Sequence, residues 1–442
     1  MTRGRGEWTA AAVAAVLFGF SFYALVAWLE RGQLSDVGLY VHYSGLVRGG
    51  GVPYRDFALE YPPAALPPML LPAWMGWSYV TSFAVLMGVC GAGCIAAATS
   101  ALRAVGAEAW RTWAALLTIG VSPLVLGSLF DTRFDLWPTL LAVAALAAVV
   151  RERPVAAGAL LGLGFAAKIW PAVLLPIAVA HLWRRRGRAG AIAVAGAFVA
   201  VAAACFVPFA ILGPAGLRAM FADQLGRPLQ VESLGAAVLM AAQRFGMAPL
   251  ATVSSHGAQA LSGRGAGLAA TLSTVLEVTT VLAVWILFAR RRHAGGEAVL
   301  LAAAAAVAAL VAFDRVLSPQ YLIWLAPFVP LVRGARGFLA GSLLVLALGL
   351  TQTWFPWHYW SLALDHAAPW SWYLLARDVA LVALAGVLLL ELGAPAETKH
   401  GLPGRALRRA AASSVARIAL PFTLPGSLHR RPARPVSAWS SR

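Results

Sequence analysis

The stretch DVGLYVHYSGLVRGGGVPYRDFALEYPP, residues 36–63, is the longest polar, turn-rich insertion in an otherwise apolar sequence. It follows closely on an uncharged apolar run, Trp8 to Leu29, that is long enough to cross a bilayer. The insertion carries three carboxylates, Asp36, Asp56 and Glu60, together with four tyrosines and two arginines. So many polar groups in one loop of a membrane protein predict a ligand site. Asp36 lies only a few residues past the span and is expected at the membrane surface.

The composition indicates a membrane protein. Of its 442 residues, 60% are hydrophobic and only 12% are charged, whereas soluble globular chains carry about 25% charged residues. The predicted fold class is therefore an all-α polytopic membrane protein that is embedded in the lipid bilayer. The net charge of +17 does not indicate nucleic acid as a partner, because the basic residues cluster in short connections, as they do on the cytoplasmic side of membrane proteins.

Apolar runs between these basic connections predict about twelve spans, with both termini cytoplasmic. The polar insertion then lies in a large first extracytoplasmic loop. Its Pro-rich distal part, residues 64–74, is too short to cross and is expected to be re-entrant or interfacial. The predicted spans are 8–29, 78–102, 112–130, 136–150, two short halves within 154–183, 189–212, 267–289, 297–313, 317–332, 337–353 and 370–391.

Two regions outside the spans have distinct compositions. A second long outer region, 213–265, is expected to contain a short amphipathic helix near residues 232–246. Residues 393–442 are rich in Pro, Ser and Arg and predict a disordered cytoplasmic tail that is drawn to anionic lipid. The membrane domain is accordingly expected to comprise residues 1–392.

The carboxylates of the first loop each allow two interpretations. Asp36 is either a catalytic carboxylate at the membrane surface or the N-cap of a short juxtamembrane helix. Arg55 and Asp56 either contact a ligand or neutralise each other, and the second interpretation is favoured. Some of the tyrosines are expected to be ordinary interface anchors.

Four cationic residues in or next to apolar runs are candidates for binding an anion: Arg133, Lys168, Arg315 and Arg377. Lys168 stands at a helix break next to Pro171, where a charged residue is either functional, paired, or extended to the interface. Arg133 is flanked by Asp131 and Asp135, which either bind hydroxyl groups of a ligand or orient Arg133, and we favour orientation. Arg377 can be neutralised by its neighbour Asp378. Glu277 falls in the middle of a span and is expected to face the bundle interior.

The block D-x3-Y … G-x-P-Y-R-D-F-x-x-E-Y-P-P within residues 36–63 resembles the first extracytoplasmic loop of polyprenol-phosphate-mannose-dependent mannosyltransferases. These are multispanning enzymes of the GT-C superfamily, in glycosyltransferase family 87. Three later stretches are similar to the same pattern and follow in the expected order: RFDLWPTLLA (Arg133 to Ala142), GALLGLGFAAKIWPAVLLP (Gly158 to Pro176) and SPQYLIWLAPF (Ser318 to Phe328).

The resemblance implies a GT-C fold in the cell membrane and inverting transfer of mannose, or a related sugar, from a polyprenyl-phosphate donor on the extracytoplasmic face. The acceptor would be a glycolipid or a cell-envelope glycan. Asp36 takes the family's role of general base, which must reach the acceptor hydroxyl. No cofactor or metal is implied if Arg or Lys stabilises the departing phosphate. The residues expected to bind substrate are Tyr40, Arg55, Asp56, Glu60, Tyr61, Arg133, Asp135, Lys168, Arg315, Gln320 and His358.

Two other classes of protein are consistent with parts of the sequence. A transporter or flippase of lipid-linked sugars would also carry intramembrane charges such as Glu277 and Lys168, but most acidic residues here lie on the outer side rather than along a path. A non-catalytic binder of lipid-linked sugars would keep the aromatic residues of the first loop without depending on Asp36. His358, in the stretch TWFPWHYW, is expected either to stack on a sugar or to belong to an interfacial aromatic belt.

Overall fold

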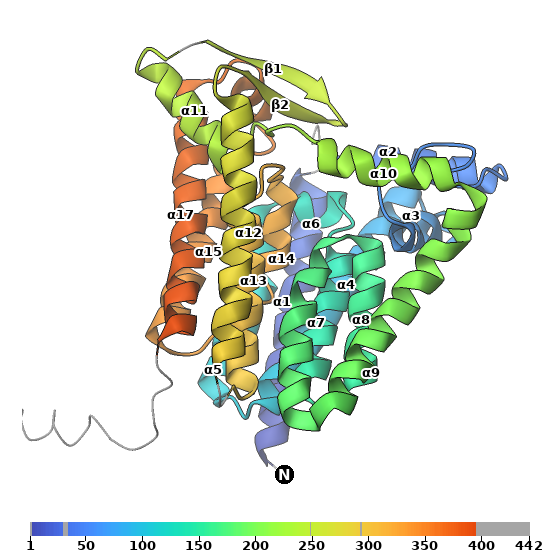
Figure 1. The fold of residues 1–442 in the computed structure, drawn as a ribbon, viewed down its shortest axis with the longest axis vertical. Coiled ribbons are helices and arrows are strands. Elements are labelled where there is room, and N and C mark those ends of the chain that lie inside the picture. Colours follow the sequence, from blue (N-terminus) through green and yellow to red (C-terminus); the bar gives the residue numbers. More distant parts are fainter. Residues whose placement is uncertain (1, 30–33, 248, 292–293, 395–442) are drawn as a thin grey trace, which may run out of the picture. The chain divides into compact units, whose positions relative to one another are not determined.

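The computed structural model describes residues 2–29, 34–247, 249–291 and 294–394, so the predicted tail lies almost entirely outside the described residues. Among these residues, eight helical segments are long and apolar enough to cross a membrane, and two apolar helices are shorter (Figure 1). The predicted class, an all-α polytopic membrane protein, is confirmed. The ten helices are α1 (Thr2–Leu29), α4 (Tyr79–Ala104), α5 (Ala109–Leu126), α7 (Leu136–Val150), α8 (Pro154–Ala167), α9 (Leu175–Leu212), α12 (Ala266–Arg290), α13 (Gly296–Phe313), α15 (Gly334–Trp354) and α17 (Ala368–Gly393).

Small residues let these helices approach closely. Helix α13 is rich in alanine, and most of its side chains are buried. In α8, Gly158 and Gly162 face the backbone of α9, and a Cβ at either position would collide with the carbonyl oxygens of Val194 and Phe198. Helices in lipid associate through such van der Waals contact, because there is no hydrophobic gain to drive them together. This packing fixes α8 and the loop that follows it.

One predicted span is wrong. Residues 317–332 do not form a continuous helix but a series of short turns: η4 (Pro319–Tyr321), α14 (Leu322–Leu325) and η5 (Val329–Leu331). Pro319, Pro327 and Pro330 lack the N–H groups that a helix requires. The apolar residues of this segment are buried inside the protein, which is where non-helical backbone is tolerated at membrane depth. Hydropathy alone does not distinguish such a buried segment from a span.

Helix α9 combines two of the predicted spans. Its backbone turns at Gly187, whose φ of 66° is not helical, and the basic residues 184–188 surround this bend. Glycine adopts this left-handed conformation without the steric cost that a Cβ would add. The helix therefore descends, bends and returns, as the basic run predicted.

The shorter elements gather at the end of the bundle opposite the N-terminus (Figure 1). They are α2 (Val37–Arg48), η1 (Pro63–Ala65), α3 (Leu66–Leu70), η2 (Leu71–Trp74), α6 (Leu129–Thr132), η3 (Trp170–Leu174), α10 (Pro214–Gly226), α11 (Leu234–Arg244), α16 (Tyr359–Ala363) and the strands β1 (Leu250–Ser255) and β2 (Ala258–Gly263). The broken segment 64–74 and the helix near 232–246 follow the sequence prediction. We refer to this end of the bundle as the loop end.

The β-hairpin was not predicted. Strands β1 and β2 pair antiparallel, with Ser255 opposite Ala258. The two turn residues His256 and Gly257 have φ values of 52° and 70°, the positive values that a two-residue type I′ turn needs. The hairpin lies across the loop end of the bundle (Figure 1).

Candidate active site

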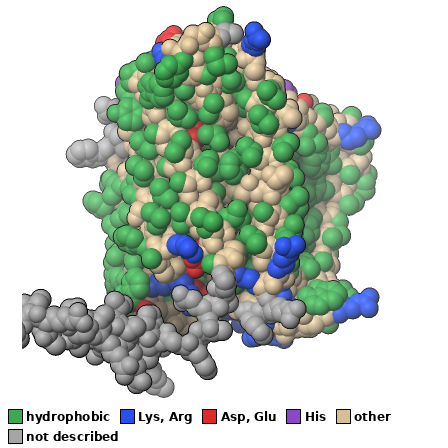
Figure 2. All heavy atoms as spheres, turned by 60° about the vertical axis from the view of Figure 1, so that its left-hand side comes forward, with side chains coloured by type: hydrophobic (Ala, Val, Ile, Leu, Met, Phe, Trp, Pro, Cys, Tyr) green, Lys and Arg blue, Asp and Glu red, His purple; other side chains and the backbone are tan. Residues whose placement is uncertain are grey.

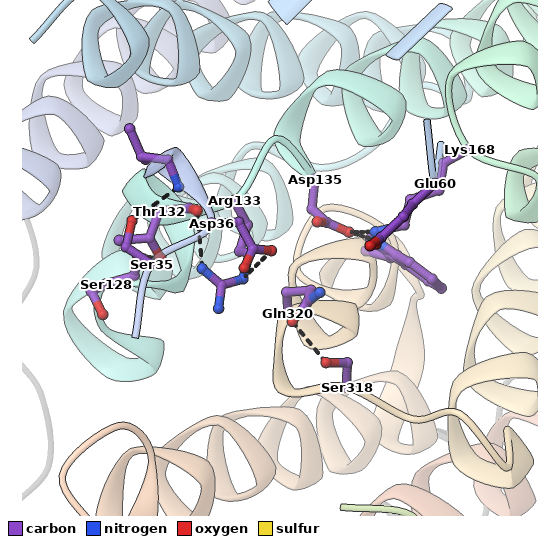
Figure 3. A network of polar contacts seen from close by, with 12 residues as sticks. Ser35, Asp36, Glu60, Ser128, Thr132, Arg133, Asp135, Lys168, Ser318 and Gln320 are labelled. Atoms are coloured by element: carbon purple, nitrogen blue, oxygen red, sulfur yellow. Dashed lines mark hydrogen bonds and ion pairs between the residues drawn. The ribbon is translucent and has the colours of Figure 1, made fainter. Parts of the chain in front are cut away.

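Asp36 lies in the turn that precedes α2, where the structure separates the two interpretations of this residue. Its side chain makes no capping hydrogen bond to α2. Instead, its Oδ2 lies 3.0 Å from Nε of Arg133, and the carboxylate stays 30% exposed (Figure 3). The carboxylate is therefore both ion-paired and accessible, two properties that a simple helix cap does not require.

Arg133 connects α6 to α7 in an extended conformation. Its side chain is 9% exposed, and its Nη1 donates to the carbonyl oxygen of Thr132 at 3.1 Å. Arg133 pairs with Asp36, whereas Asp135, whose φ and ψ are already helical at the start of α7, has other partners. The prediction that Asp135 orients Arg133 is accordingly not what the contacts show.

Asp135 holds Lys168 instead. Nζ of Lys168 donates to Asp135 Oδ1 at 2.7 Å, and Nε1 of Trp324 donates to the same oxygen at 2.6 Å. The Asp135 side chain is 1% exposed and that of Lys168 is 15% exposed. Lys168 is thus a paired, nearly buried cation and does not extend alone to the interface.

Aromatic rings surround the Lys168 ammonium group. Its Nζ lies 5.2 Å from the ring centroids of Phe134, Tyr321 and Trp324, distances at which a cation is attracted to a ring face. Trp324 stacks between Tyr321, at 4.0 Å, and Trp170, at 4.9 Å. The break after α8, the stretch RFD and the turns at 319–325 therefore converge on one point.

Two tyrosines of the first loop, Tyr40 and Tyr61, pack against each other and against Phe134 of the RFD stretch. Tyr40 is fully buried, and its ring lies 6.3 Å from that of Tyr61 and 5.8 Å from that of Phe134. Tyr61 packs edge-on against Phe134 at 5.0 Å. The structure thus places Tyr40 and Tyr61 next to the RFD stretch, and packing gives both an evident structural role.

Glu60, at the end of the first loop, borders the site that contains Asp36. Burial raises the pKa of its carboxyl, the charge of Asp36 raises it further, and the guanidinium of Arg227 opposes the shift. Nη2 of Arg227 lies 3.9 Å from Glu60 Oε2. Glu60 is therefore close enough to Asp36 for their charges to interact.

Arg55 and Asp56 neutralise each other at the surface. Arg55 donates from Nε and Nη2 to both carboxylate oxygens of Asp56, at 2.9 and 2.8 Å, and the side chains are 49% and 40% exposed. Asp56 also accepts from the backbone N–H of Val52 at 2.8 Å. These hydrogen bonds lower the pKa of Asp56 to about 2. The loop satisfies its own polar groups here, as the favoured interpretation predicted.

The remaining predicted residues have separate partners. Arg315 donates to the carbonyl oxygen of Leu225, and Gln320 accepts from the Ser318 hydroxyl at 2.8 Å. His358 stacks flat on Trp370 at 3.8 Å. Arg377 lies 3.0 Å from Asp378, and both side chains are completely buried in α17.

Glu277, for which the sequence suggested no partner, lies within electrostatic range of Asp314 and Arg315. Sequence reasoning also missed Gln230 and Glu232, which lie between α10 and α11 and are nearly inaccessible to solvent. The only sequence signal was their alternation with the apolar residues Leu229 and Val231. Among the described residues, no group of three or more His, Cys, Asp or Glu side chains is placed to hold a metal ion.

The fold and the site together define a polytopic membrane protein with a polar centre at the loop end of its helical bundle. The chain belongs to glycosyltransferase family 87, whose family model matches residues 59–319, more than half of the sequence. It is therefore a membrane glycosyltransferase. The matched range includes Glu60, Arg133, Asp135 and Lys168, whereas Asp36 precedes it. No curated protein matches the chain significantly.

Proposed function

We propose that this glycosyltransferase moves mannose, or a related sugar, from a polyprenyl-phosphate donor to a hydroxyl group of a glycolipid or cell-envelope glycan. The reaction takes place at the extracytoplasmic surface of the cell membrane and inverts the anomeric carbon. The observation that carries the proposal is the grouping of one accessible carboxylate, Asp36, with two cationic side chains, Arg133 and Lys168, at one end of an apolar bundle. A lipid phosphate that carries a sugar needs such a site at the level of the membrane surface.

In the proposed reaction, Asp36 is the general base. The acceptor oxygen attacks the anomeric carbon while the Asp36 carboxylate takes its proton, and the bond between that carbon and the phosphate oxygen breaks. The polyprenyl phosphate leaves with the bonding electrons. Proton transfer to a positioned carboxylate contributes about 10²–10⁴-fold to the rate of such a step.

The cationic side chains stabilise the leaving phosphate. The Arg133 guanidinium can release the Asp36 carboxylate and bind a phosphate oxygen instead. This exchange frees Asp36 to accept a proton. Lys168, fixed by Asp135 at 2.7 Å, supplies a second positive charge that needs no rearrangement. Preorganised charge in a site shielded from water stabilises developing charge more strongly than mobile solvent does.

Sugar transfer in isolated membranes tests this proposal. Membranes that contain the protein are incubated with radiolabelled polyprenyl-phosphate-mannose and a lipid extract as acceptor, and membranes without the protein are the control. The proposal predicts protein-dependent appearance of label in a glycolipid or glycan fraction. Label that enters only from a nucleotide sugar, and never from the lipid-linked donor, would contradict it.

A further inference from the structure

The segment Arg227–Ser233, sequence RPLQVES, joins α10 to α11 and crosses the loop end of the bundle next to the hairpin (Figure 1). From Leu229 to Ser233 every residue is at most 5% exposed. Its backbone is bonded on two sides. Gln230 N–H donates to the carbonyl of Arg315 at 2.9 Å, and Val231 N–H donates to that of Gln259 at 3.0 Å. The segment is a fixed part of the fold, although it has no regular secondary structure.

Its polar side chains are buried without being fully bonded. Oε1 of Gln230, Oε2 of Glu232 and Nε of Arg227 have no hydrogen-bond partner among the described residues. Leaving a buried polar group without a hydrogen bond destabilises the fold, so three such atoms in one short segment need an explanation. Arg377 does not provide one, because it donates to the backbone carbonyl of Glu232 and leaves the carboxylate oxygen untouched.

These side chains belong to the same centre as Lys168 and Arg133. The charges of Arg227, Glu232 and Asp135 all act on the hydroxyl of Tyr321, whose ring stacks on Trp324 beside Lys168. The hydroxyl of Tyr359 in turn lies within electrostatic range of both Glu232 and Arg133. The segment therefore borders the site, and its Arg227 lies next to Glu60 of the first loop, at 3.9 Å.

The chemistry of these atoms matches a polyhydroxylated ring. An amide oxygen accepts a hydrogen bond from a hydroxyl group. Burial raises the pKa of Glu232 to about 7, so near neutral pH its carboxyl can donate as well as accept. We infer that Gln230 and Glu232 bind hydroxyl groups of the sugar being transferred and thereby determine which sugar the enzyme uses. This inference rests on the proposed function, since it takes the sugar to arrive on a lipid phosphate.

Binding of two short-chain probes tests the inference. Purified protein in lipid nanodiscs is titrated with farnesyl phosphate and with farnesyl-phosphate-mannose, and the ratio of the two dissociation constants measures recognition of the sugar. Wild-type protein is expected to prefer the glycosylated probe by about tenfold or more, because two hydrogen bonds contribute about 1 kcal/mol each. Gln230→Leu and Glu232→Gln are each expected to reduce this ratio severalfold while the affinity for farnesyl phosphate stays unchanged.

The matched control is Gln259→Leu in β2. Gln259 accepts a hydrogen bond from Ser254 with its side chain, and its carbonyl, which supports Val231, survives the substitution. The control is expected to retain the wild-type ratio. Unchanged affinity for farnesyl phosphate shows that a variant is folded. If Gln230→Leu binds neither probe, that variant is misfolded, and the isosteric variant Glu232→Gln then tests the inference alone.

Two results would overturn the inference in distinguishable ways. A wild-type ratio in both variants would remove Gln230 and Glu232 from sugar recognition and leave the proposed donor class intact. Wild-type protein that binds neither probe would overturn the donor class and this inference with it.

Discussion

At the scale of single residues, the site depends on charges that are held in pairs. Asp36 is balanced by Arg133 and Asp135 by Lys168, and each pair joins segments that are far apart in the sequence. A nearly buried pair such as Asp135 with Lys168 adds little net stability when intact, but removing one partner leaves an uncompensated charge. The pairs therefore link the integrity of the site to the stability of the fold.

The pair of Lys168 and Asp135 gives the first prediction. Lys168→Met should lower the free energy of unfolding by about 3–5 kcal/mol, because it leaves the Asp135 carboxylate buried without its cation. The double variant Lys168→Met with Asp135→Leu should regain most of the lost stability. It should not regain transferase activity. Thermal unfolding in detergent, together with a sugar-transfer assay, measures both quantities. A double variant less stable than Lys168→Met would show that the pair is not the source of the loss.

Glu232 gives a prediction about pH. Its pKa in the folded protein, about 7, lies above the ordinary value of 4.5, so the folded state binds the proton more tightly. The associated stability is fully present below about pH 4.5 and is lost as the pH rises through 7. Relative to Glu232→Gln, wild-type protein should lose about 3 kcal/mol between pH 4.5 and pH 8. The free energy of unfolding of each protein is measured across this pH range. The same pH dependence in both proteins would contradict the raised pKa of Glu232.

At the scale of elements, composition predicted most helices, whereas the proposed site lies in the segments that interrupt or connect them. Hydropathy and basic connections located α4, α7, α12 and α13 to within a few residues. The segment 317–332 was misread because a buried, proline-broken stretch is as apolar as a span. The hairpin at 250–263 escaped prediction because its strands are short and only the His256–Gly257 turn identifies it.

The site was predictable to the extent that its residues fall in motifs. Asp36, Arg133 and Lys168 each stand out as charges at the edges of apolar runs. The partners of Asp135 and the role of residues 227–233 depend on contacts between distant segments, such as Gln230 with Arg315. Spacing in a single sequence does not show which distant segments meet.

An ion pair at the opposite end of the bundle tests how its elements are held. Arg111 of α5 donates to both carboxylate oxygens of Glu297 in α13, at 2.5 and 2.8 Å, and its side chain is only 10% exposed. Arg111→Leu should destabilise the protein by about 1–3 kcal/mol, since Glu297 loses its partner in a partly buried place.

The matched control for this prediction is Arg336→Leu. Arg336 pairs with Glu391 at 2.8 Å, with side chains 50% and 36% exposed, and such surface pairs contribute about 0–1 kcal/mol. Thermal unfolding in the same detergent compares the two variants. Equal effects of the two substitutions would show that burial of the Arg111 pair adds nothing.

At the scale of the whole molecule, tryptophans and basic residues mark two levels of the bundle. Exposed tryptophans lie near the loop end, at Trp74, Trp77 and Trp357, and at the opposite end, at Trp110 and Trp183. Figure 2 shows a face that is largely apolar in its middle, with Lys and Arg side chains gathered near its lower end. Aromatic residues at both interfaces and basic residues on the cytoplasmic side are typical of membrane proteins. The proposed orientation with the site outside rests on this pattern.

Labelling of introduced cysteines tests the orientation. Arg218→Cys in α10 and Arg188→Cys beside the bend of α9 replace exposed arginines at opposite ends of the bundle. A membrane-impermeant maleimide added to intact cells should modify the first variant and reach the second only after the cells are opened. The parent protein, whose Cys90 and Cys94 are buried, measures the background. The reverse pattern would place the site on the cytoplasmic side.

The central claim is that Asp36 is the general base, and the most direct measurement compares Asp36→Asn with Asp56→Asn. Both changes remove one carboxylate charge from the first loop, but Asp56 is paired with Arg55 at the surface. Transfer from polyprenyl-phosphate-mannose and binding of farnesyl phosphate are measured for each variant. The account predicts that Asp36→Asn lowers the transfer rate by about 10²–10⁴-fold while it still binds the lipid phosphate, and that Asp56→Asn stays close to wild type. Wild-type transfer by Asp36→Asn would contradict the account.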